Sequence, residues 1–119
     1  MDPTLIAEPA DVPVGDVSLS ARVERTAGGT HWDVTVLIAR RPDEPPLPAG
    51  DVTADLAAGG HRLALVRRDE GDLVEAGGGL GATANATFRF GAAPDGAIPD
   101  RLQVGYRGAA VDFALRSAP

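Results

Sequence analysis

The chain has 119 residues, a length typical of one domain with one apolar core, and its formal net charge is -6. All of its cations are arginine, and it contains no cysteine. The lack of lysine and cysteine excludes Schiff-base chemistry, a P-loop lysine, a thiol nucleophile, thiolate metal sites and disulfides. We therefore expect no cofactor that depends on these groups.

The same composition restricts the partners and the compartment. An acidic chain lacks the clustered cations that bind nucleic-acid phosphates, and no apolar run reaches the ~18 residues of a membrane helix. Neither nucleic acid nor a membrane is therefore expected as a partner. The first residues show neither a cationic leader nor a long apolar stretch, which predicts a cytoplasmic location, with export after signal removal left open.

Residues 1–14 are predicted to form an extended N-terminal segment, followed by a single domain over residues 15–119. Apolar and polar residues alternate over 17–23 and again over 32–38, with a glycine pair between the two stretches. A period of two is typical of half-buried strands, so these stretches are predicted to form a hairpin.

The next segment, residues 41–50, contains four prolines and is predicted to connect sheets or edges, because proline removes backbone donors. A second hairpin is predicted from residues 51–56 and 61–68, around a glycine pair, followed by a polar turn at 69–72. Residues 82–90 alternate again and predict a further strand.

The last stretch, "RLQVGYRGAAVDFAL" at 101–115, alternates on both sides of an Arg-Gly turn and predicts a hairpin that offers apolar side chains to one core. Seven to eight short strands predict an all-β, antiparallel immunoglobulin-like β-sandwich, with a small β-barrel as the alternative. The residues expected to share one core are Val34, Val36, Phe88, Phe90, Val104 and Phe113.

The C-terminal third resembles bacterial immunoglobulin-like domains of the DUF4352 type. The resemblance is carried by a strand ending in "FRF", a loop with "IPD" and the stretch "LQVGYRGAAVDFAL". It implies an accessory or interaction domain and supplies no catalytic residues.

Two motifs could support a ligand site. "GGGLGA" at 77–82 fits a dinucleotide-binding pattern, but a strand is predicted after it where that pattern needs a helix. His31 and His61 each precede a predicted strand and could form a metal or acid–base site with Asp33 or Asp55. Solvated residues at turn edges are the alternative for both histidines.

Two further segments have a functional and a structural interpretation. The acidic turn at 69–72, together with Asp95 and Asp100, could supply oxygens to Ca²⁺, although turn residues often carry carboxylates for local hydrogen bonding. The prolines of residues 41–50 have P-x-x-P spacing and could form a polyproline ligand, with a stiff linker as the alternative.

The candidate partner-binding residues are Arg107, Tyr106, Trp32 and Leu47. Trp, Tyr and Arg are enriched at binding hot spots, while core packing is the alternative for Trp32 and Tyr106 and solvent exposure for Arg107. The sequence therefore predicts a non-enzymatic immunoglobulin-like interaction module that binds a protein partner. A small-ligand or metal-binding β-barrel is the first alternative, and a small accessory enzyme is the second.

Overall fold

The protein is an all-β chain in the computed structural model, which describes residues 4–8, 11–14, 17–26, 30–40, 52–70, 74–76, 81–93, 95–106 and 108–117. No helix in this part of the chain is long and apolar enough to cross a membrane. The strands are β1 (Thr4–Glu8), β2 (Val12–Val14), β3 (Val17–Arg25), β4 (His31–Arg40), β5 (Val52–Ala58), β6 (His61–Arg62), β7 (Leu65–Glu70), β8 (Val74–Ala76), β9 (Gly81–Gly91), β10 (Arg101–Tyr106) and β11 (Ala109–Ser117).

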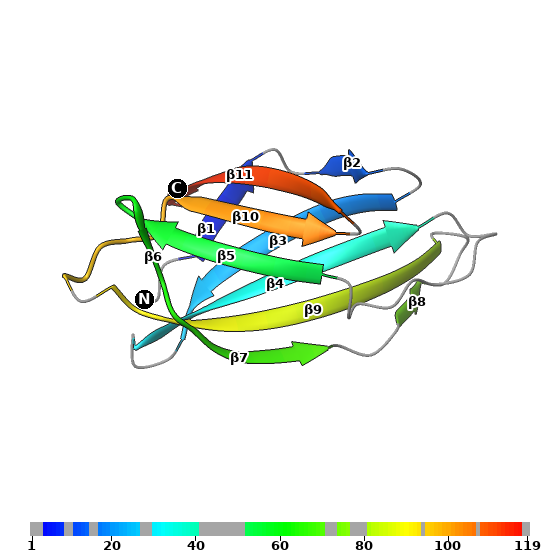
Figure 1. Ribbon diagram of the computed structural model, residues 1–119. Helices are drawn as coiled ribbons and strands as arrows, with labels where there is room; N and C mark the ends of the chain where they lie inside the picture. Colours follow the sequence, from blue (N-terminus) through cyan, green and yellow to red (C-terminus); the bar gives the residue numbers. More distant parts are fainter. Residues whose placement is uncertain are drawn as a thin grey trace.

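These strands form one antiparallel sheet with the order β6-β5-β10-β11-β1-β3-β4-β9-β7, in which β2 also pairs with β3 and β8 with β9. The sheet curls over, so that β5, β10 and β11 lie in front of β4 and β9 (Figure 1). No ladder joins β5 to β7 within the described residues. The all-β prediction is confirmed, and the sheet has a closed side at β1 and an open side between β5 and β7.

Strand β1 lies between β11 and β3 and joins the front and back of the curled sheet. Leu5 is opposite Val23 of β3 and Ser117 of β11, and Leu5 is only 1% exposed. The segment predicted to be extended before the domain thus contributes β1 and β2 to the sheet.

Two predicted hairpins are present. Strands β3 and β4 pair over their whole length, with Val23 opposite Val34, and β10 pairs with β11, with Leu102 opposite Phe113. The second turn contains Gly108 at φ 85°, a left-handed conformation that glycine adopts without steric cost.

The hairpin predicted from residues 51–56 and 61–68 is wrong in its second half. Gly59 and Gly60 form the turn with positive φ angles, but β6 pairs with β5 through only two residues, Arg62 opposite Ala57 and His61 opposite Ala58. Leu63 is buried there, and the chain then joins the other layer as β7, which pairs with β9. Apolar burial at this crossing favours the change of layer over a longer hairpin.

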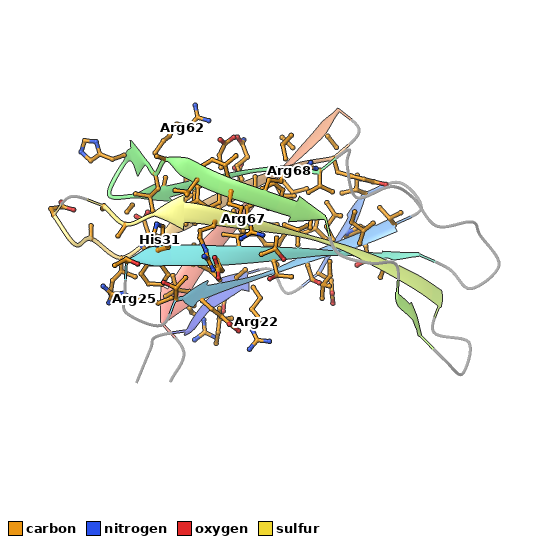
Figure 2. All side chains as sticks on the ribbon, turned by 90° about the horizontal axis from the view of Figure 1, so that it is seen from below. Arg22, Arg25, His31, Arg62, Arg67 and Arg68 are labelled. Atoms are coloured by element: carbon orange, nitrogen blue, oxygen red, sulfur yellow. The ribbon has the colours of Figure 1, made fainter. Side chains whose placement is uncertain are left out.

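The core fills the space between the two layers. Side chains with relative exposure of 0–1% include all six residues predicted to share the core, namely Val34, Val36, Phe88, Phe90, Val104 and Phe113. No polar or charged residue is buried in the described part of the chain. Many charged side chains project into solvent, with Arg22 and Arg62 on opposite sides of the molecule (Figure 2). The charged groups of the described residues are therefore accessible to solvent, whereas the Tyr106 hydroxyl is a polar atom inside the core.

Candidate functional site

Two of the predicted partner-binding residues lie in the core. Trp32 and Tyr106 are each 2% exposed, so neither side chain is presented to a partner. The guanidinium carbon of Arg25 lies over the Trp32 ring, 5.6 Å from its centroid, a distance typical of a cation–π contact. Arg107 and Leu47 lie outside the described residues.

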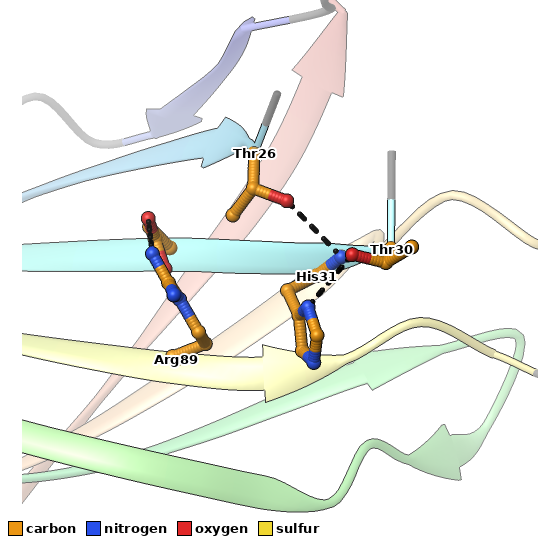
Figure 3. Close-up of polar contacts among 5 residues, drawn as sticks. Thr26, Thr30, His31 and Arg89 are labelled. Carbon is orange, nitrogen blue, oxygen red and sulfur yellow. Dashed lines mark hydrogen bonds and ion pairs between the residues drawn. The ribbon is translucent and has the colours of Figure 1, made fainter. Parts of the chain in front are cut away.

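His31 is engaged by its own neighbours at the start of β4 (Figure 3). Its Nδ1 lies 2.8 Å from Thr30 Oγ1, and its backbone N–H donates to Thr26 Oγ1 over 3.3 Å. Asp33, the carboxylate predicted to join it, instead accepts hydrogen bonds from Arg89 Nε at 2.8 Å and Nη2 at 3.1 Å. The predicted His31–Asp33 site is therefore replaced by two separate local networks.

The other predicted metal ligands are also engaged or dispersed. His61 is exposed at the β5–β6 turn, and Asp55 pairs with Arg62. Asp95 accepts a hydrogen bond from the backbone N–H of Ala97 at 3.0 Å, as expected of a turn carboxylate. The described residues contain no group of three or more His, Cys, Asp or Glu side chains that could hold a metal.

Two motifs and one turn from the sequence cannot be placed completely. The proline-rich residues 41–50 lie outside the described part of the chain. The glycine-rich residues 77–80 and the end of the acidic turn, residues 71–72, do so as well.

The outward side of β5, β10 and β11, which we call the β10 face, gathers polar side chains from three strands. Gln103 of β10 lies opposite Asp55 of β5 on one side and opposite Asp112 of β11 on the other. Directly opposed residues of antiparallel strands point to the same side of the sheet. Because the inward neighbours Leu102 and Val104 are fully buried, this row must point outward.

A depression of about 360 Å³ lies on the β10 face. Its lining residues are Asp55, Ala57, Arg62, Arg101, Gln103 and Asp112. Ala57 is directly opposite Arg101, so a short side chain stands next to a long one and the surface is hollow there. The depression combines cationic, anionic and amide groups without any apolar side chain larger than alanine.

Some charged side chains of this depression form an ion pair with each other, and others do not. Arg62 forms an ion pair with Asp55, which neutralises one cation and one anion. Arg101 and Asp112 are both exposed, and neither forms an ion pair with another residue of the described part of the chain. The face thus offers a guanidinium, a carboxylate and the Gln103 amide for intermolecular contacts.

Gly105 lies two residues after Gln103 on the same face of β10. A Cβ at this position would overlap Thr53 Oγ1 of the neighbouring strand, so the side chain of Thr53 fills the space above the glycine. The next residue across, Ala110 of β11, is also small. The outer surface around Gly105 therefore carries only small side chains.

A second depression, of about 400 Å³, lies at the β5–β6 end of the molecule. Its lining residues are Ala58, His61, Arg62, Ala93 and Asp95. This is the place where the structure brings a predicted histidine next to a carboxylate from a different loop. It does not bring His61 together with His31 as lining residues of one pocket.

Arg101, Gln103 and Asp112 were not singled out by the sequence analysis, because outward polar residues alternate in the same way on any half-exposed strand. One signal was available: a hairpin that turns at residues 107–108 places Gln103 opposite Asp112. The pairing of β10 with β5 carries no comparable local signal, since these strands are far apart in the chain.

No family model, no curated protein and no solved structure matches this chain.

Proposed function

We propose that this protein is a non-enzymatic, immunoglobulin-like interaction module that binds a protein partner through the β10 face. The observation that carries the proposal is the separation of polar from apolar groups. Apart from the Tyr106 hydroxyl, the described interior is built from apolar side chains, while Arg101, Gln103 and Asp112 gather on one outer face beside a depression.

This separation favours binding of a macromolecule over binding inside a barrel. Ligand pockets cover most of a small molecule and place polar groups on their inner walls, but here the inner walls are packed against each other. An outer sheet face covers a ligand from one side only. Protein interfaces use such faces, bury about 800 Å² per partner and are enriched in arginine at their centres.

Site-specific cross-linking tests the proposal. A photoreactive amino acid replaces Gln103, at the centre of the β10 face, and in a matched variant it replaces Leu37, which is 39% exposed on β4. Each variant is irradiated in an extract of the source cells, and cross-linked products are identified by mass spectrometry. We expect one protein to be captured at position 103 and competed away by unlabelled wild-type chain.

The matched position decides the outcome. Capture of the same protein with equal yield at position 37 would mean that the contact is not located on the β10 face. Equal capture by a Gln103 variant that also carries Arg101→Ala and Asp112→Ala would likewise argue against a specific site. No competable product at either position, in an extract where the chain is folded, would overturn the proposal.

A second candidate function, binding of a small ligand, is supported by the depression at the β5–β6 end. His61 and Asp95, both predicted as possible site residues, line it together with the apolar Ala58 and Ala93. A ligand bound there would raise the midpoint of thermal unfolding by mass action, and His61→Ala would reduce the increase. Co-purification of a small molecule whose binding depends on His61 would favour this candidate.

A cytoplasmic site of action is part of the same proposal. It is supported by the lack of cysteine and therefore of disulfides, which are rare in proteins of reducing compartments. Expression of the chain in its source cells followed by fractionation tests it, and recovery of the protein outside the cytoplasm would contradict it.

A further inference from the structure

We infer that the β10 face takes an extended peptide segment that carries one acidic and one basic side chain two positions apart. The acidic side chain contacts Arg101 and the basic one contacts Asp112. This inference rests on the proposed function and specifies the partner's chemistry.

The shape of the face favours an extended segment. The depression is lined by Arg101 and Gln103 of β10, and Gly105 follows two residues later on the same face of that strand. The residues on β5 and β11 that lie opposite Gly105, Thr53 and Ala110, are small. A chain lying along β10 would therefore meet no bulky side chain at that end.

The charges specify the sequence of that segment. Arg101 is opposite Ala114 of β11, and Asp112 lies two residues before Ala114, so the two charges are diagonal neighbours on the same face. Diagonal neighbours are separated by about 7–8 Å, which is close to the spacing of alternate residues in an extended strand. One acid and one base at alternate positions would therefore contact both groups at once.

A segment of a larger chain fits this face better than a free small molecule. The depression lies on the outside of a sheet, where one side of a bound molecule stays in solvent, whereas small ligands need most of their surface covered. A peptide that extends past the depression gains contacts along Gly105 that a small zwitterion cannot reach. The Arg62–Asp55 ion pair beside the depression has no net charge, so it does not change the charges that the peptide must complement.

The experiment uses the full chain labelled with ¹⁵N and four synthetic peptides, each an alternation of threonine and valine. Each peptide carries a test pair at two alternate positions, so that both side chains point to the same side of the extended chain. The four pairs are Glu and Lys, Glu and Gln, Gln and Lys, and Gln and Gln. Binding is followed by amide chemical shifts. Because an exposed ion pair contributes up to about five-fold in affinity, we expect the Glu and Lys peptide to bind more tightly than the neutral one by roughly that factor for each charge.

Single substitutions assign each charge. Arg101→Ala should remove the preference for Glu and leave the preference for Lys, and Asp112→Ala should do the reverse. Arg22→Ala is the control, since Arg22 projects on the side of the molecule away from Arg62 and should change neither preference (Figure 2). We expect the largest shifts at Gln103 and Gly105.

Equal affinity for all four peptides, or shifts confined to the β5–β6 end, would overturn the inference. Failure of every peptide to bind, with competable cross-linking at Gln103 retained, would also overturn it and leave the protein-binding proposal standing. Loss of competable cross-linking at position 103, with peptide binding retained, would overturn the protein-binding proposal and leave the peptide preference of the β10 face standing.

Discussion

Arg68 of β7 donates a hydrogen bond from Nη2 to the carbonyl oxygen of Val52 in β5 over 3.1 Å, across the side of the sheet that no ladder closes. Its guanidinium carbon also lies 5.5 Å from the centroid of the Phe88 ring. Arg68 is opposite Phe88 in the β7–β9 pairing and so belongs to the inward face of an edge strand. An inward charge at an edge discourages the addition of another strand. Arg68 therefore connects the two layers and protects the edge at once.

Arg68→Met should lower the free energy of unfolding by about 1–2 kcal/mol, because methionine keeps much of the apolar stem and loses the hydrogen bond and the cation–π contact. Urea unfolding followed by Trp32 fluorescence measures the change. The control is Arg101→Met on the exposed β10 face, where surface substitutions usually change stability by less than about 0.5 kcal/mol. Equal stability of the two variants would show that Arg68 does not connect the layers.

Phe113→Ala should lower the free energy of unfolding by about 3–5 kcal/mol, because it leaves a cavity in a core that has few large side chains. Phe113 is 1% exposed and lies opposite Leu102, which is fully buried. The neighbouring Asp112→Ala, on the opposite face of the same strand, is the matched control and should cost far less. A loss below about 1 kcal/mol for Phe113→Ala would contradict its place in the core.

The sequence predicted the inward residues of the long strands because alternation is a local property. Val34 and Phe113 are examples, and each is buried as expected. The position of β1 could not be predicted in this way, since Leu5 is buried by strands that follow it in the chain by many residues. Pairing between distant strands depends on the packing of the whole sheet, and a five-residue segment carries little information about it.

The candidate site illustrates the same limit. Arg101 and Asp112 are related by a hairpin whose turn was predicted, so their proximity could have been derived from the sequence. The contribution of Asp55 depends on β5 lying next to β10, which only the fold reveals. Conversely, Trp32 and Tyr106 were candidates by residue type, but their positions in the alternation already placed them on the buried face.

Millimolar Ca²⁺ or Zn²⁺ should leave the midpoint of thermal unfolding unchanged. A metal that binds only the native chain stabilises it by mass action, and the described residues do not bring three suitable ligands together. Differential scanning calorimetry with and without a chelator measures this. An increase of several degrees that is lost in His61→Ala or Asp95→Ala would contradict the expectation and would favour the ligand-binding candidate.

Gly105→Ala should destabilise the protein even though the change is small and lies on the outer face. The new Cβ would overlap Thr53 Oγ1 on β5, so the threonine must leave its rotamer or the strands must move apart. A displaced rotamer costs about 0.5–1.5 kcal/mol, and this is the expected loss in the free energy of unfolding. Chemical denaturation of the single and double variants measures it.

In a Thr53→Ala background the overlap disappears, since a Cβ at 105 would lie 3.8 Å from the Cβ of residue 53. Gly105→Ala should then be neutral or slightly stabilising, because alanine restricts the unfolded chain more than glycine does. The same loss in both backgrounds would mean that the close approach of β5 and β10 at this point does not cause the effect.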